Sequence, residues 1–344
     1  MRKNFRRVGV VLLILCVFAS AVGYIVCQTP LLTRWLIHSL ITRALPDAAI
    51  SKISISRQSV HYPPRFQLSD LIVEFNQRSR PCRLSLPEAR LDGLSLIFST
   101  SQGARVLVRN FEIQCTDISI GGLNLEADLR VSGRGAWING EINAGFTQVG
   151  LARVEFIQAH LNGDSKQLTF SDFTAQGYQG TLTGKMIVYL QPTVNFDIQM
   201  DLNNLDIAEL KKFNASIFSQ MEGKLYGRIR SKGTPINVEE LEIKAHLAQG
   251  AKMKATLMKY FASYLPSVQR KDLEALIQQD ALIPVERAVF GLSSVNPREL
   301  TGLMQLSSKR LNVQLNVPIT IKTDGRWDEL IHFFQRIHLE KLKL

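Results

Sequence analysis

Residues 123–131 read LNLEADLRV, in which every second residue is apolar and the residues between are polar or charged. The same pattern runs through 194–202 (VNFDIQMDL) and 311–321 (LNVQLNVPITI), where only Pro318 interrupts it. Alternation with a period of two predicts β-strands with one apolar and one solvated face, as in antiparallel sheets. Weaker alternation recurs through much of the chain beyond residue 50. The sequence therefore predicts a mostly β fold built on a long antiparallel sheet.

Three helical interruptions are predicted within this pattern. The first is a short amphipathic stretch at 206–218, and the second is an insert at 251–280 that Pro266 divides into two helices. The third is a C-terminal helix at 325–344, whose apolar residues share one face. That face consists of Trp327, Leu330, Ile331, Phe334 and Ile337.

An apolar sheet face has to be covered, and alternation alone leaves three ways open. A second sheet can pack on it, as in a sandwich. Helices can cover it. The sheet can also curl into a groove whose apolar lining stays accessible to acyl chains.

The N-terminal region predicts a membrane anchor. Residues 8–27, VGVVLLILCVFASAVGYIVC, contain no charge, and four cations precede them in the flank 1–7. About 20 helical residues span ~30 Å, the thickness of the hydrocarbon core of a bilayer. The positive flank is expected to stay cytoplasmic, which places the rest of the chain outside the cytoplasm. A cleavable signal peptide is the alternative, because 19–21 (ASA) offers a small-residue site, although the apolar run continues to Cys27.

After the anchor we expect a juxtamembrane helix at 28–46. Thr29 and Pro30 provide a capping residue and a proline at the first helical position, and Pro46 ends the helix. The remainder, 47–344, shows no low-complexity linker, and we predict no domain boundary within it.

Composition and cysteine content narrow the class of protein. Hydrophobic residues make up 45% of the chain and the formal net charge is +11, which fits a folded domain with a mildly basic surface. No basic run is interleaved with aromatic residues, so nucleic acid is not an expected partner. Cys82 and Cys115 lie in strand-like stretches of the external part. In a compartment that permits disulfides they are either bridged or two free thiols, and the sequence does not decide between these.

The sequence offers no pattern for catalysis or for a metal site. The six histidines are scattered without ligand spacing, and no phosphate-binding loop or nucleophile elbow is present. We therefore predict a protein that is not an enzyme and has no cofactor.

Three segments together resemble the AsmA-like group of bacterial envelope proteins. The first is the anchor followed by TPLLTRWLIHSLITRALP (29–46) and the strand pair that begins ISKISISRQSVHYPP (50–64). The second is FTAQGYQGTLTGKMIVYL (173–190). The third is DLNNLDIAEL (201–210) followed by MEGKLYGRI (221–229). The length of the chain is closer to the small members, such as the type II secretion protein N.

The resemblance implies a sheet curled into a β-groove, the β-taco fold, in a periplasmic domain anchored in the inner membrane. It implies binding or transfer of phospholipids or other acyl-chain lipids between membranes, or a part in outer-membrane assembly. The alternative is an envelope scaffold with a filled core and protein partners, such as a type II secretion accessory component. The candidate groove lining comes from the apolar side of the strands, although for any single one of these residues ordinary core is the favoured interpretation. The candidates are Leu125, Leu129, Phe196, Ile198, Met200, Val313 and Leu315.

Overall fold

The computed structural model describes most of the chain beyond residue 47. The described residues are 34–35, 37–39, 48–61, 65–77, 80–93, 103–116, 118–132, 135–190, 194–212, 214–234, 237–296, 298–323, 325–326 and 330. The predicted anchor at 8–27 and almost all of the predicted C-terminal helix at 325–344 lie outside these ranges. Within them, no helix combines the length and the apolar character needed to cross a bilayer.

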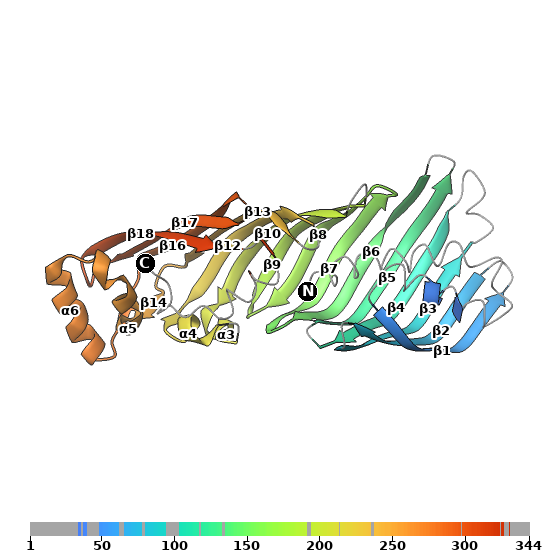
Figure 1. Ribbon diagram of the computed structural model, residues 1–344, viewed down its shortest axis with the longest axis horizontal. Coiled ribbons are helices and arrows are strands. Elements are labelled where there is room, and N and C mark those ends of the chain that lie inside the picture. Colours follow the sequence, from blue (N-terminus) through green and yellow to red (C-terminus); the bar gives the residue numbers. More distant parts are fainter. Residues whose placement is uncertain are drawn as a thin grey trace. The chain divides into compact units, whose positions relative to one another are not determined.

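The described strands form a 15-stranded sheet whose neighbours follow chain order from β1 to β18, and a separate three-stranded sheet, β11-β14-β15 (Figure 1). The prediction of a mostly β fold with a long antiparallel sheet is confirmed. The prediction that this sheet curls into a groove is wrong, because the sheet is neither curled nor closed, and β1 and β18 are its two edges. Period-two alternation specifies which residues share a face, but it carries no information about curvature.

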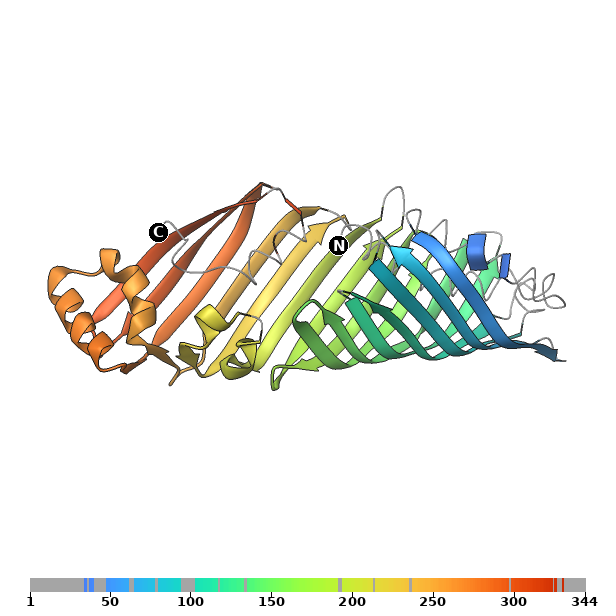
Figure 2. The same cartoon turned by 60° about the horizontal axis from the view of Figure 1, so that its bottom comes forward.

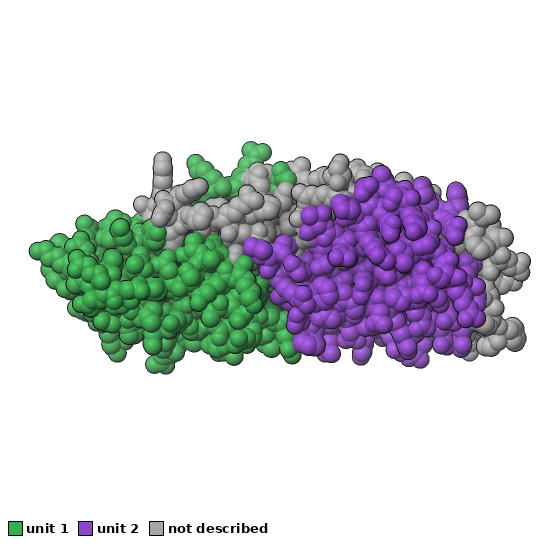
Figure 3. Space-filling model, turned by 90° about the horizontal axis from the view of Figure 1, so that it is seen from below, with its two compact units in different colours: residues 1–2, 176–184, 195–344 green, residues 3–175, 185–194 purple. Residues whose placement is uncertain are grey.

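The chain divides into two compact units, coloured in Figure 3. Unit 2 comprises 3–175 and 185–194, and unit 1 comprises 1–2, 176–184 and 195–344. The strands of unit 2 pair antiparallel in a meander, and long alternating stretches such as 123–131 lie in them. They are β1 (Ala48–His61), β2 (Arg65–Gln77), β3 (Arg80–Asp92), β4 (Ala104–Cys115), β5 (Ile118–Ser132), β6 (Gly135–Val149), β7 (Ala152–Asp164) and most of β8 (Gln167–Gly177).

The apolar side of unit 2 is a filled core. Side chains from β2 to β8 form one buried cluster, and Ile37 of the short helical stretch 37–39 belongs to it. Among its largest members, Leu68, Leu86 and Leu125 are completely buried. Each such side chain contributes roughly 1.5–3 kcal/mol of transfer free energy, so this cluster dominates the stability of the unit.

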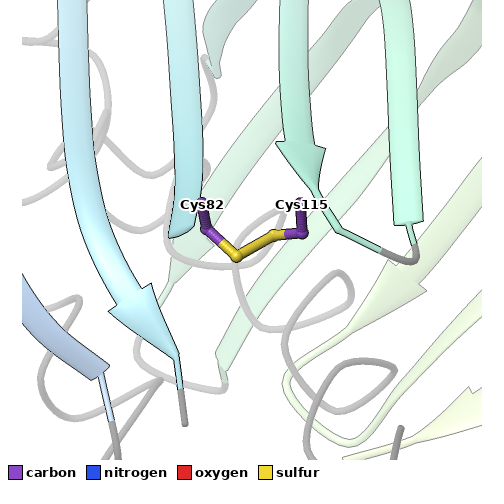
Figure 4. The surroundings of a disulfide bond; sticks show 2 residues. All are labelled: Cys82 and Cys115. Carbon is purple, nitrogen blue, oxygen red and sulfur yellow. A yellow bond between two sulfur atoms is a disulfide. The ribbon is translucent and has the colours of Figure 1, made fainter. Parts of the chain in front are cut away.

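A disulfide joins Cys82 to Cys115 inside this core. The two residues are direct cross-strand partners in β3 and β4, with their Cα atoms 4.3 Å apart (Figure 4). The sequence did not decide whether the two cysteines are bonded, and the register of β3 against β4 makes the bond possible by placing them opposite each other. The bond constrains a chain separation of 33 residues.

Single left-handed residues interrupt several strands of unit 2. Asn110 in β4, Gly122 in β5 and Phe156 in β7 have φ of 52°, 64° and 50°. Gly122 lies against Gly145, and the pairing of Ala144 with Ile157 places Phe156 opposite Gly145 as well. At Asn110 and Gly122 the register of β4 against β5 shifts, as at β-bulges, and such bulges bend a strand and increase its local twist.

Unit 1 contains the remaining strands and the described helices of the C-terminal half. The part of β9 (Gly180–Tyr189) up to residue 184 belongs to it. Its long strands are β10 (Asn195–Asp206), β12 (Lys224–Gly233), β13 (Val238–Leu247), β16 (Arg287–Asn296), β17 (Glu299–Ser308) and β18 (Val313–Lys322). The shorter elements are α3 (Ile207–Leu210), α4 (Ala215–Phe218), β11 (Met221–Glu222), β14 (Lys252–Lys254), α5 (Ala255–Met258), η2 (Lys259–Tyr264), α6 (Ser267–Gln278) and β15 (Leu282–Pro284).

Helices cover one end of the apolar face of unit 1. The helices within 251–280 pack on β17 and β18, where Phe261 and Leu257 share a buried cluster with Leu315. Figures 1 and 2 show α5 and α6 beside the ends of these strands. Next to them, Ile207 of α3 is buried against Leu247 of β13. The helical interruptions predicted at 206–218 and 251–280 are therefore present, each divided into shorter pieces.

A tight corner begins α3, and residues that carry the family resemblance form it. The Asp206 carboxylate accepts a hydrogen bond from the Ala208 amide at 2.8 Å and pairs with the Lys224 ammonium at 2.9 Å. The Lys224 ammonium, followed by the Ala208 amide, holds the pKa of the Asp206 carboxyl below its usual value. Asn204, at φ 59°, accepts a hydrogen bond from the Tyr226 hydroxyl at 3.2 Å. The DLNNLD sequence is thus explained by a bulge and a helix cap.

Candidate apolar binding surface

The predicted groove residues all lie on the apolar face of the sheet, but the structure does not bring them together. Leu125 and Leu129 belong to the filled core of unit 2, where both are buried. They therefore offer no accessible surface to a ligand.

The other five predicted residues lie in unit 1 and differ in exposure. Phe196 and Leu315 are buried, whereas Ile198, Met200 and Val313 are half-buried. Ile198 and Met200 belong to β10, and Val313 lies at the start of β18. The predicted set is thus divided between buried core and partly accessible surface.

The partly accessible residues of unit 1 define a surface that we call the apolar band. Cross-strand pairing places them in two adjacent rows that cross from β10 to β18, for example Met200 opposite Ile229 and Ile229 opposite Ile243. Phe290 opposite Met304 continues the second row. The half-buried members are Met200, Leu202, Ile229, Ile243, Phe290, Met304 and Ile319.

Small residues lie between these side chains. Gly227 lies opposite both Leu202 and Ala245, and Gly302 lies opposite Ile319. At these positions the sheet presents backbone rather than bulky side chains. A Cβ added at Gly227 would lie 2.7 Å from the Lys244 carbonyl oxygen, which shows how closely the neighbouring strand approaches.

Buried clusters lie at both ends of the strands, and most members of the apolar band pack partly against them. On one side, Leu306 and Leu315 are buried with η2 and α5. On the other side, Leu330 packs with Leu241 and Leu300. Across the strands, the six from β10 to β18 span about 24 Å at their usual spacing. One acyl chain occupies about 15 Å in a membrane, half of the ~30 Å hydrocarbon core, so the band is long enough for an extended chain.

The opposite face of unit 1 is charged and largely paired. Arg228 contacts Asp201 at 2.6 Å across β12 and β10, and Lys232 contacts Glu240 at 2.9 Å across β12 and β13. The hydrogen bond that the Arg228 guanidinium donates to the Asp201 carboxylate raises the pKa of Arg228 above its usual value. Exposed pairs of this kind contribute little stability, and they mark this side as the solvated face.

Sequence reasoning missed most of the apolar band. The stretch KLYGRIRSKG (224–233) has Gly227, Ser231 and Gly233 at positions where the alternation calls for apolar residues, which weakens its apolar period. The only signal for Ile229 and Ile243 was their spacing from Leu225 and Leu241, and that spacing does not separate core from accessible surface. Within the ranges that the structure describes, no three histidine, cysteine or acidic side chains are placed to hold a metal ion.

Comparison of the chain with family models, with curated proteins and with solved structures finds no match.

Proposed function

We propose that this protein is anchored in the inner membrane of a bacterial envelope and binds lipid acyl chains on the apolar band of its periplasmic part. In this role it contributes to phospholipid transport between membranes or to outer-membrane assembly. The observation that carries the proposal is the apolar band itself, a row of half-buried side chains about 24 Å long.

The chemistry of the band suits a hydrocarbon ligand. Methionine side chains such as Met200 and Met304 adapt their shape to irregular apolar partners. Gly227 and Gly302 contribute no side chains to the two rows. Covering the half-buried side chains would gain about 25 cal/mol for each Å² of apolar surface removed from water.

Two further features agree with the proposed location. The apolar run 8–27 with its basic flank predicts an anchor and an external domain. The Cys82–Cys115 disulfide is of the kind that persists in oxidising compartments such as the periplasm. The resemblance of 201–210 and 221–229 to AsmA-like proteins supports the same placement.

Site-specific photocrosslinking tests the proposal. A photoreactive phenylalanine analogue replaces Met304 on the apolar band in the full chain, and the protein is irradiated in native membranes. Its adjacent residue Leu303 provides a matched control, since it is apolar and 40% exposed but lies on the opposite face of the same strand. We expect a lipid adduct in the mass spectrum of the Met304 variant and none in the Leu303 variant.

The second candidate function is a protein scaffold, which the filled core of unit 2 favours. A packed apolar side is what a scaffold needs, and the cluster around Leu125 leaves no open surface there. The same experiment separates the two functions. Protein adducts at either position, with no lipid adduct at Met304, would overturn lipid binding and support the scaffold.

A further inference from the structure

The solvated face of unit 2 carries a hollow that the proposed function does not use. It has a volume of about 620 Å³ and lies over β4, β5, β6 and β7. Polar side chains dominate its lining, among them Asn124, Asn139, Asn143, Glu141 and His160. The hollow lies on the side of the sheet opposite to the buried core.

Strand register arranges these side chains as a grid. Asp128 pairs with Asn139, and Asn139 pairs with Asn162. The next row places Glu126 opposite Glu141, and Glu141 opposite His160. The third row contains Asn124, Asn143 and Gln158. Carboxylate acceptors and amide groups that both donate and accept therefore lie side by side at strand spacing across the floor of the hollow.

Several side chains in this grid have no hydrogen-bond or ion-pair partner among the residues that the structure describes. Among the described residues, Asn139, Asn143, Glu141 and His160 take part in no side-chain hydrogen bond or ion pair, whereas Glu126 is paired with Arg105. Glu126 and Glu141 are directly opposite, an arrangement of like charges that destabilises a sheet. The arrangement costs stability without a structural benefit, which indicates that it has another use.

Aromatic residues stand at both ends of the grid. Trp137, one pair beyond Asn139 on β6, lies on the solvated face with Arg130 over its ring at 5.5 Å. Phe156 lies at the opposite end, opposite Gly145, and is 63% exposed at φ 50°. A left-handed conformation is unusual and strained for a bulky residue, and strain of this kind clusters at binding sites. Eight residues along β6 separate the two ends, about 27 Å.

We propose that the solvated face of β4–β7 binds a neutral oligosaccharide, with its hydroxyl groups on the Asn–Glu–His grid and a sugar ring against Phe156. Amides and carboxylates match sugar hydroxyls, which donate and accept hydrogen bonds. Aromatic side chains supply apolar area for the rings while remaining partly solvated.

The charges of the hollow favour a neutral ligand over a charged one. Its lining contains two arginines, Arg105 and Arg109, and three carboxylates, those of Glu126, Asp128 and Glu141. The near balance attracts neither an acidic glycan nor a basic peptide strongly, because each would meet like charges as well as opposite ones.

Titration calorimetry on the full chain tests the proposal. The protein is kept in a zwitterionic detergent that carries no sugar, and the probes are the N-acetylglucosamine tetramer and maltotetraose. A tetrauronate and a tetralysine peptide serve as charged comparators. We expect heat of binding for at least one neutral tetramer, and at least tenfold weaker or no binding for the comparators.

Variants identify the site. Glu141→Gln and Phe156→Ala should each weaken binding of the neutral tetramer at least tenfold. Glu112→Gln is the matched control, because Glu112 is exposed on the same face of β4 beyond Asn110 and forms no ion pair among the described residues. Glu141→Gln also removes the repulsion from Glu126, so its melting temperature should stay or rise while its binding falls. Any of three results would overturn the proposal. They are no binding of either neutral tetramer, equal binding by Glu141→Gln and the parent protein, and tighter binding of tetralysine than of the neutral tetramers.

Discussion

Replacing Leu125 by alanine should cost far more stability than replacing Ile198 by alanine, although both residues lie on the apolar face of the sheet. The two changes are chemically matched, since each removes three carbon atoms. Leu125 is 0% exposed within the core of unit 2, whereas Ile198 is half-buried in unit 1. The comparison therefore measures whether the apolar face is filled in one unit and accessible in the other.

The expected magnitudes follow from burial. Three buried carbons carry about 2.4 kcal/mol of transfer free energy at ~0.8 kcal/mol each. At Leu125 the change also leaves a closed cavity, which brings the loss to about 3–5 kcal/mol. At Ile198 part of the side chain already contacts solvent and no closed cavity forms, so we expect about 1–2 kcal/mol. The predicted difference is roughly 2 kcal/mol.

Native-state hydrogen exchange read by mass spectrometry suits a chain with two compact units, because it reports the free energy of opening for each strand separately. Peptides from β5 report on Leu125→Ala, and peptides from β10 report on Ile198→Ala. Conservative Leu125→Met and Ile198→Val variants are the controls, and each should cost less than its alanine counterpart. Equal losses at the two sites, or a larger loss at Ile198, would refute the assignment of a filled core in unit 2 and a partly accessible apolar face at β10 in unit 1.

Three other predictions rest on single features. The double variant Cys82→Ala, Cys115→Ala should lower the free energy of unfolding of unit 2, measured in urea, by about 4 kcal/mol. This value follows from the chain-entropy relation for a loop of 33 residues. A peptide map of the unreduced parent protein should show the two cysteine peptides joined. Asp206→Asn keeps the helix cap but loses the Lys224 pair, so it should cost about 1 kcal/mol or less. Because the folded pKa of Asp206 lies below its ordinary 3.8, the stabilisation it supplies is present above pH 3.8 and is lost as the pH falls through the folded value, so parent and variant should converge in strong acid. The mass of the mature protein should include residues 8–27; a chain that begins at Val22 would show that the anchor is cleaved.

Much of the strand pattern followed from the sequence. The alternation in 123–131, 194–202 and 311–321 predicted strands, and these stretches lie in or largely in β5, β10 and β18. The apolar side was also predictable, because a period of two assigns residues to faces without any tertiary information. Helices at 206–218 and 251–280 were marked by a change of period and by Pro266.

The pairing of the two cysteines could not be predicted from the sequence. Cys82 and Cys115 lie in two stretches of strand character, and a shift of one residue in register would place one of them on the other face. The register of β3 against β4 makes them direct partners. The grid on the solvated face of β5, β6 and β7 depends on register in the same way, since Glu126, Glu141 and His160 are far apart in the chain.

By itself, the sequence determined the class of the fold, the two faces of its strands and the positions of its helical interruptions, because these depend on local periodicity and local breakers. Only the tertiary structure decided that the sheet is open, that Leu125 is core while Met200 is partly accessible, and that polar side chains from four strands share one hollow. The physical reason is that burial and curvature depend on register, on bulges such as those at Asn110 and Gly122 and on which helices pack over each face. These are relations between distant segments, and alternation along one strand does not contain them.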